Sequence, residues 1–143
     1  MVDGHDDPFS LIGAVARSLK TTVERRLVEH GVYAGQHVIL MCLWDQDGLT
    51  PGQLARRIGL ETATITRTVQ RMEANDLVSR RPDDTDRRMV QVWLTPRGKA
   101  LRAVIPRILA QIRAEVFADL SVRDQAMLSQ LLSRVRVRQP PAD

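Results

Sequence analysis

The sequence has few cysteines and few aromatic residues, and these shortages exclude several kinds of protein. Its single cysteine, Cys42, excludes a disulfide within the chain. Aromatic residues make up only 3% of the 143 residues, so aliphatic side chains must fill the core. No apolar run approaches the roughly 20 residues of a membrane span, and the opening residues MVDGHDDPFS lack a signal-peptide pattern. We therefore expect a soluble, cytoplasmic protein.

The motifs of enzymes and of metal sites are also missing. The sequence has no glycine-rich phosphate loop, no paired carboxylate motif and no nucleophile elbow. His5, His30 and His37 lack the spacing of metal ligands, and one cysteine adds little to them. The sequence therefore predicts no enzyme, no cofactor and no metal site.

Positive charge is concentrated in the middle of the chain. The net charge is +4, and residues 50–99 hold ten Lys/Arg against six Asp/Glu. Residues 1–30 hold four Lys/Arg against five Asp/Glu. A basic segment of this kind favours an anionic partner for the middle third.

Helical periodicity dominates both ends of the chain. Ile12, Val15, Leu19 and Val23 recur at helical spacing in a first long helix, which Gly31 should end. A second long apolar stripe follows Thr95, the predicted N-cap, although Pro106 should kink that helix. A last helix follows Ser121 as its cap.

The middle of the chain has the pattern of a helix-turn-helix. Thr50 is a predicted N-cap, Pro51 occupies the first helical position, and Gln53 completes a capping box. Gly59 then permits a sharp turn into a second helix. That second helix is a candidate recognition helix.

The candidate recognition helix, residues 62–74, has one apolar face and one polar face. Ile65, Val69 and Met72 share the apolar face. The polar face carries the hydroxyl, amide and guanidinium groups that read a major groove. Most such faces are merely solvated, but this one has few acids. The predicted DNA contacts are Thr62, Ala63, Thr64, Thr66, Arg67, Gln70 and Arg71.

Two predicted strands around the charged turn RRPDDTDRR form a hairpin after this helix. A hairpin in this place is a wing, whose tip can insert arginine into a minor groove. We expect Arg87 and Arg88 to make this contact and Asp86, on the same side of the strand, to hold an arginine in position. The alternative is a solvated turn with incidental ion pairs, each contributing about 0–1 kcal/mol.

At this point the chain resembles the MarR family of winged-helix regulators. The resemblance is carried by LTPGQLARRIGLETATITRTVQRMEANDLVSRRPDDTDRRMVQVWLTPRGKAL, and above all by its R-P-x-x-x-D-R-R wing followed by L-T-x-x-G. It implies a mainly α fold with a small β-hairpin wing. The winged helix-turn-helix DNA-binding domain would occupy residues 35–94. A helical dimerisation domain would be built from residues 8–34 and 95–138.

The resemblance also implies a function. A homodimer would bind double-stranded DNA at a pseudo-palindromic operator with half-sites about one helical turn (~34 Å) apart. Such a regulator would act as a repressor and be released by a small anionic or aromatic ligand. An alternative is a winged helix that binds protein rather than DNA, although Arg67, Gln70 and the wing arginines favour DNA.

The chain departs from the family pattern at two places near the recognition helix. Glu61 stands where the family often has serine, and glutamate is a poorer N-cap. The family's Glu-x-x-Gly-Leu is EANDL here, so Asn75-Asp76 must make the turn. We expect Asn75 to tolerate the left-handed backbone that the turn needs.

Candidate sensing residues lie in the first third of the chain. A ligand pocket could be lined by Arg17, Tyr33, His37, Met41 and Trp44. For His37 the alternative is a buried histidine with its hydrogen bonds satisfied. Cys42 could make the protein redox-responsive, but no second cysteine can resolve a sulfenate, so a structural thiol is the favoured interpretation.

Overall fold

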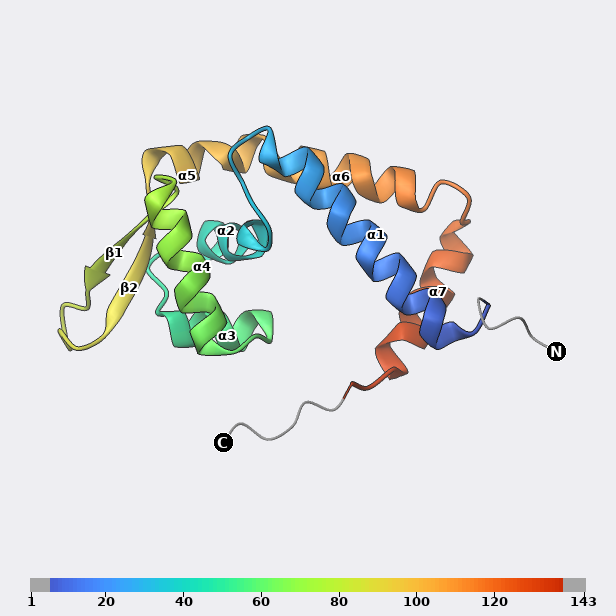
Figure 1. The fold of residues 1–143 in the computed structure, drawn as a ribbon, viewed down its shortest axis with the longest axis horizontal. Helices are drawn as coiled ribbons and strands as arrows, with labels where there is room; N and C mark the ends of the chain where they lie inside the picture. The colour runs from blue at the N-terminus through green and yellow to red at the C-terminus, as the bar shows by residue number, and fades with distance from the viewer. Residues whose placement is uncertain (1–5, 138–143) are drawn as a thin grey trace. The chain divides into compact units, whose positions relative to one another are not determined.

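A computed structural model describes residues 6–137 of the chain (Figure 1). The elements in order are α1 (Pro8–Val28), α2 (Gln36–Asp45), α3 (Pro51–Ile58), α4 (Thr62–Ala74), β1 (Val78–Pro82), β2 (Val90–Leu94), α5 (Pro96–Ala100), the 3-10 helix η1 (Leu101–Ala103), α6 (Ile105–Val116) and α7 (Val122–Arg134). The predicted fold class, mainly α with a hairpin wing, is confirmed.

The chain divides into two compact units, Met1–Leu109 and Ala110–Asp143, and the boundary falls within α6. The first unit holds α1, the helix-turn-helix, the wing, α5 and η1. The predicted division into residues 35–94 and a dimerisation domain of residues 8–34 and 95–138 concerns two copies of the chain and stays a prediction. Its last residue, 138, lies outside the described residues.

The core of the first unit lies under the helix-turn-helix and the wing. Its fully buried side chains come from the end of α1, from α2, α3 and α4, from the hairpin, from the segment after α5, and from the loops that follow α1 and α2. Aliphatic residues fill it, as the shortage of aromatics predicted. The largest of them are Leu27, Ile39, Leu40, Leu43, Leu49, Leu54, Ile65, Met72, Leu77 and Ile105.

The helix-turn-helix forms as its capping and turn residues predict. The Thr50 side chain accepts a hydrogen bond from the N–H of Gln53 (3.2 Å), and the Gln53 side chain accepts one from the N–H of Thr50 (2.9 Å). Gly59 ends α3 with φ at 80°, a left-handed conformation that glycine adopts without steric cost. The capping box therefore fixes where α3 begins, and Gly59 lets the chain turn from α3 into α4.

The hairpin is an antiparallel pair whose base is fixed to the chain before α3. Val78 pairs with Leu94 and Pro82 with Val90. An isolated bridge joins Leu49 to Val92, and the Asp47 carboxylate accepts a hydrogen bond from the N–H of Leu94 (2.9 Å). The wing is therefore attached to the core along one edge of its base.

The prediction of one long helix after Thr95 is wrong, because the structure has three separate helices there, α5, η1 and α6. Thr95 caps α5 through the N–H of Gly98, as expected (3.1 Å). The chain then tightens into η1, and α6 begins at Ile105. Pro106 has no N–H for the carbonyl of Arg102, so an α-helical ladder cannot continue through this point. The kink expected at Pro106 is a full interruption.

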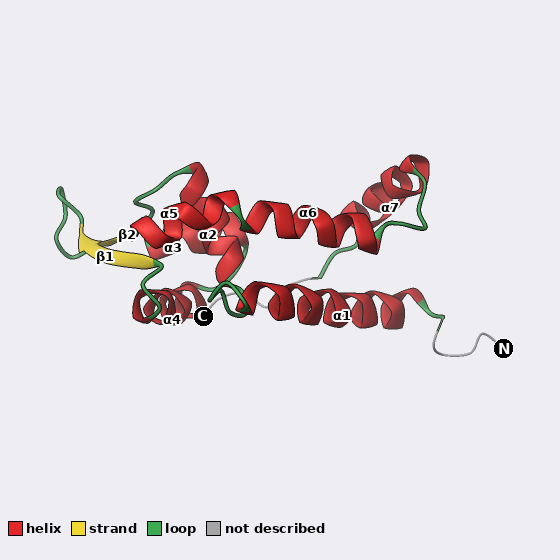
Figure 2. Cartoon of the chain, turned by 90° about the horizontal axis from the view of Figure 1, so that it is seen from above, coloured by secondary structure: helices red, strands yellow, loops and turns green. Residues whose placement is uncertain are grey.

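Helix α1 is drawn as one uninterrupted helix in Figure 2. Asp7 caps it by accepting hydrogen bonds from the N–H groups of Phe9 and Ser10. Gly31, predicted to end it, has φ at 72° three residues beyond its last residue. Within the described residues, no helix is long and apolar enough to cross a membrane.

Gly48 supplies a test of how tightly the base of the wing is packed. Its φ is 74°, and a Cβ there would lie 2.5 Å from Cζ2 of Trp93. Gly48→Ala should therefore lower the free energy of unfolding by more than about 1 kcal/mol, because it adds backbone strain to a steric clash. Urea unfolding at neutral pH measures the change.

Gly52→Ala is the matched control. Gly52 lies in the first turn of α3 at an ordinary φ, and the nearest atom to its added Cβ is Oγ1 of Thr50 at 4.0 Å. Alanine is the better helix former, so stability should rise slightly or stay the same. Equal losses for the two variants would contradict the close packing of Trp93 on Gly48.

Candidate nucleic-acid interface

Helix α4 has the two faces that its sequence predicts. Ile65, Val69 and Met72 are buried against the core. Among the predicted contact residues on α4, the exposed ones are Thr62, Ala63, Arg67, Gln70 and Arg71. The helix therefore presents small, amide and guanidinium groups on one accessible surface.

Thr64 and Thr66 are half-buried at the edges of this surface. The carbonyl of Thr64 accepts a hydrogen bond from the Thr68 hydroxyl (2.9 Å). Thr66 lines a hollow of about 420 Å³ between the start of α3, α4 and the wing. Both threonines thus lie beside the exposed face rather than at its centre.

The start of α4 is uncapped by a side chain. Glu61 occupies the N-cap position, and its carboxylate makes no capping hydrogen bond. This agrees with the expectation that glutamate is a poor substitute for serine there.

The turn after α4 differs from the prediction by one residue. The left-handed residue is Asp76, with φ at 58°, whereas Asn75 has φ at −92°. The expectation that Asn75 adopts the left-handed conformation is therefore wrong. The N–H of Leu77 bonds to the carbonyl of Met72 (2.9 Å), which places the left-handed position one residue later in the turn.

The tip of the wing is ordered by Asp83. Its Oδ1 accepts hydrogen bonds from the N–H of Thr85 (2.7 Å), the hydroxyl of Thr85 (2.6 Å) and the N–H of Asp86 (3.2 Å). The hydrogen bonds from Thr85, side chain first, hold the pKa of Asp83 below its ordinary value. An aspartate used in this way makes an Asx turn, which fixes the backbone of the tip.

Asp86 and Arg88 form the predicted pair, but they do so in a turn before β2 rather than in an extended segment, because the N–H of Met89 donates a hydrogen bond to the carbonyl of Asp86 (2.9 Å). Oδ1 of Asp86 accepts hydrogen bonds from Nε of Arg88 (3.2 Å) and from its backbone N–H (3.1 Å). The Arg88 side chain is 92% exposed, so its guanidinium projects from the tip into solvent. Asp86 therefore restricts the conformations of an arginine side chain that packs against little else.

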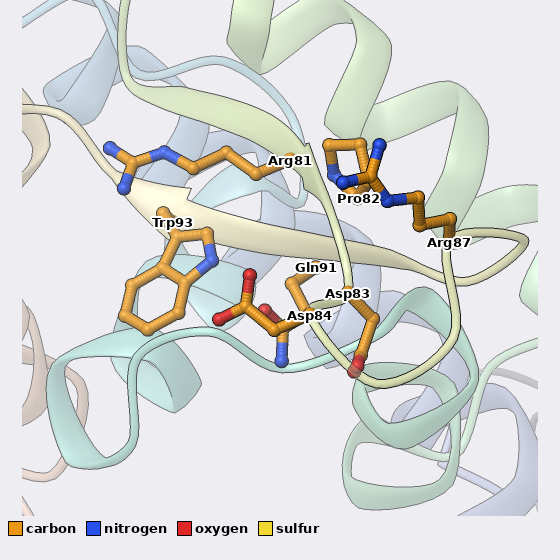
Figure 3. A pocket seen from close by; sticks show the side chains of 7 residues that line it. All are labelled: Arg81, Pro82, Asp83, Asp84, Arg87, Gln91 and Trp93. Atoms are coloured by element: carbon orange, nitrogen blue, oxygen red, sulfur yellow. The ribbon is translucent and has the colours of Figure 1, made fainter.

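Arg87 faces a different part of the wing. It lines a hollow of about 470 Å³ on the hairpin, which also includes Arg81, Asp83, Asp84 and Trp93 (Figure 3). The guanidinium of Arg81 lies over the Trp93 ring, 5.7 Å from its centre. Acidic and basic side chains both line this hollow, so their charges largely cancel and the hollow is not an obvious site for an anion.

Three hydrogen bonds between Glu73 and Arg80 join α4 to the wing. Oε1 of Glu73 accepts hydrogen bonds from Nε (3.1 Å) and Nη2 (2.9 Å) of Arg80, while Oε2 accepts one from the Arg80 backbone N–H (3.0 Å). The side-chain hydrogen bonds from Arg80, followed by the backbone one, hold the pKa of Glu73 below its ordinary value. Glu73 is on α4 and Arg80 on β1, so this contact sets their relative orientation.

The five residues predicted to line a ligand pocket are spread over α1, α2 and the loop between them. Arg17 lines a shallow hollow on α1 with Ser18, Thr21, Thr22 and Arg25. Tyr33 and Met41 are about half exposed. Burial lowers the pKa of His37, and the Trp44 indole donates a hydrogen bond to the carbonyl of Gly98 (2.9 Å). The pocket stays a prediction, and Trp44 also has a structural role.

Cys42 is half-buried, and burial raises the pKa of its thiol. Because the thiolate is the reactive form, this environment favours the structural interpretation over redox sensing.

Sequence reasoning missed the residues that brace the interface. The Glu73–Arg80 contact and the Asp47 and Trp93 contacts join elements that are far apart or that meet only in the folded hairpin. The Asx turn at Asp83 did have a local signal, because aspartate two residues before threonine in a tight turn is typical of that motif.

Glu73 gives a pH-dependent test of the brace. Its pKa is depressed in the folded state from an ordinary value of 4.5, so it stabilises the fold fully above that pH and less as pH falls through the folded pKa. Glu73→Gln should lower the free energy of unfolding at pH 7 by up to about 1 kcal/mol, since the pair is partly exposed. The difference from wild type should become smaller in urea unfolding as the pH falls below 4.5 toward pH 3.

Glu61→Gln makes the same charge change without the contacts to Arg80. It should leave the free energy of unfolding nearly equal to that of wild type at both pH values. If Glu73→Gln lowers the free energy of unfolding as much at pH 3 as at pH 7, the carboxylate charge is not what braces the wing.

Comparison with known proteins places this geometry in a family. Residues 32–90 match the family model described as "MarR family". The chain is 31% identical over 106 residues to the HTH-type transcriptional regulator TtmR of Methylorubrum extorquens, a match that covers 69% of this chain and 54% of TtmR. The chain thus spans about half the length of that curated relative.

Solved structures share the fold over most of the chain. A mutant MarR from E. coli complexed with operator DNA is 25% identical, with a TM-score of 0.80 over 87% of this chain and 89% of that one. The transcriptional regulator SlyA is 23% identical, with a TM-score of 0.81 over 90% of each chain. The family match, the relative and the shared fold agree: the chain belongs to the MarR family of transcriptional regulators, whose family model matches residues 32–90.

Proposed function

We propose that this protein is a sequence-specific, double-stranded DNA-binding transcriptional regulator. The observation that carries the proposal is the bracing of two DNA-reading elements in one unit. The exposed face of α4 and the wing are joined by Glu73 and Arg80, so they meet a duplex together. The homologous MarR of known structure in complex with operator DNA supports this assignment.

In this proposal α4 enters the major groove. Arg67 and Arg71 supply guanidinium donors for guanine or phosphate, and Gln70 supplies an amide for adenine. Ala63 and Thr62, in the first turn, allow close approach to a base edge or a thymine methyl. Thr64 and Thr66, at the edges of the face, are placed for phosphates.

The wing reaches an adjacent minor groove in the same binding mode. The exposed Arg88 inserts there, attracted by the negative potential between the phosphates. Asp86 holds that guanidinium before binding, which reduces the conformational entropy lost on insertion. Arg87, on the hairpin hollow, contributes a second positive charge close to the backbone.

We further propose that the regulator is a homodimer. Apolar side chains are exposed along α1, with Phe9 at 86%, and along α7, with Val122 at 85%. Soluble proteins rarely leave such a series of apolar side chains exposed to water, and in this proposal a second copy of the chain packs against them. Two lobes would then read a pseudo-palindrome, as the family resemblance implies. Repression, and release by a small anionic or aromatic ligand, are further parts of this proposal.

The experiment that tests the function is selection of bound sequences from a random duplex pool by the purified protein. A pseudo-palindrome with half-sites about one turn apart (~34 Å) is the expected result. On that operator the affinity should fall by a factor of about 10³–10⁵ between roughly 50 and 200 mM salt, if six to ten phosphates are contacted. No enriched motif, with a flat salt titration, would support the protein-binding alternative instead.

Arg88→Ala tests the wing contact. Loss of the guanidinium should weaken operator binding by more than about 1 kcal/mol, roughly fivefold, which exceeds the contribution of an exposed ion pair. Fluorescence anisotropy with a labelled operator measures it. Arg102→Ala, which removes an exposed arginine of η1, is the control and should change the affinity little.

Asp86→Ala distinguishes an orienting carboxylate from a repulsive one. It should also weaken binding, although it removes a negative charge, because Arg88 loses its partner. Asp84→Ala removes the same charge from the same exposed tip and should leave binding unchanged or slightly tighter. Tighter binding by both variants would mean that Asp86 acts only through its charge.

A further inference from the structure

The first turn of α5 is bound closely to the turn that follows the recognition helix. The hydroxyl of Thr95 donates a hydrogen bond to the carbonyl of Asp76 (2.6 Å), and its N–H donates one to the carbonyl of Leu77 (3.1 Å). Gly98 lies so close to the Leu77 carbonyl that a Cβ would overlap it. In Figure 1, α5 accordingly lies next to the end of α4. The start of α5 and the end of α4 therefore move as one body.

Arg97 extends this body to the end of α1. One terminal nitrogen of its guanidinium donates a hydrogen bond to the carbonyl of Asn75, the residue that ends α4. The other donates to the carbonyl of His30, just after α1 (3.4 Å). Gly31 leaves room for the guanidinium, since a Cβ at this position would overlap it. A single side chain thus joins the C-terminal ends of two helices.

The chemistry of this bridge suits arginine. Carbonyl groups at the C-terminal end of a helix lack intrahelical partners and carry partial negative charge. A guanidinium is planar, permanently charged and presents several donors in a fixed arrangement, so it can satisfy two such carbonyls at a set separation. A lysine has a single nitrogen on a flexible stem and cannot span both in the same geometry.

We infer that Arg97 is a positioning residue that fixes the orientation of the recognition helix relative to α1, and so determines which half-site spacing the regulator accepts. The inference rests on the proposed function, in which α1 contributes to the dimer contact and α4 reads the groove. If the joint between these helices is stiff, only one separation of the two recognition helices is available without strain. A looser joint lets the two lobes adapt to other spacings.

The experiment uses the full-length protein and three duplexes: the selected operator, and versions with one base pair added or removed between the half-sites. Affinities are measured for wild type, Arg97→Met, Arg97→Lys and the control Lys99→Met, which removes an exposed positive charge from the same helix. Thermal unfolding of each variant is recorded in the same buffer. All binding is measured well below the lowest unfolding temperature.

Wild type should prefer the selected spacing. Arg97→Met should reduce this preference by about fivefold, at the low end of coupling between separate sites because the bridge is exposed. Arg97→Lys should keep part of the preference for the selected spacing, and the control Lys99→Met should keep all of it. The measured quantity is a ratio of affinities, so a general loss of stability would not change it.

Three results would overturn the inference. An unchanged preference in Arg97→Met, with or without a lower unfolding temperature, would make the bridge merely structural. An equal loss of affinity for all three duplexes, with a salt slope reduced by about one, would make Arg97 a phosphate contact. Wild-type binding without any preferred sequence or spacing would contradict the proposed function itself, and with it this inference.

Discussion

The contact between Glu73 and Arg80 is the constraint on which the proposed DNA-reading surface depends. An exposed ion pair alone contributes little, but this carboxylate also accepts a hydrogen bond from the backbone N–H of Arg80, so it fixes the middle of β1 as well as a side chain. The same contact gives Glu73, the one acidic residue within α4, a positive partner. The other attachments of the wing lie at its base, through Asp47, Leu49 and the buried side chains that the hairpin gives to the core.

Side-chain hydrogen bonds hold the part of the wing where binding is proposed. The backbone of the wing tip is held by Asp83, and the arginine that projects from it is held by Asp86. Both acids lie beside arginines for which we propose contacts with DNA, and this accounts for the mixture of opposite charges in RRPDDTDRR. The aspartates lower the number of conformations that the unbound loop explores, and the arginines supply the attraction.

Local signals in the sequence predicted what local chemistry controls. The capping box at Thr50, the glycine turn at Gly59 and the Asp86–Arg88 pair each involve residues within a few positions of one another. The brace between Glu73 and Arg80 could not be predicted, because it exists only once the strand folds back along the helix. At Asp76 and Pro106 the residue types were recognised but the outcome was not: the left-handed residue is Asp76 rather than Asn75, and the helix is interrupted before Pro106 rather than kinked there.

The placement of the two tryptophans has a practical consequence. The sequence contains only Trp44 and Trp93. Trp93 packs on Gly48 beneath the guanidinium of Arg81, at the base of the wing, and Trp44 is hydrogen-bonded to the first turn of α5. The intrinsic emission of the unlabelled protein therefore comes from the two joints around which the reading surface is built. A single substitution at either tryptophan would leave an optical probe of the other joint alone.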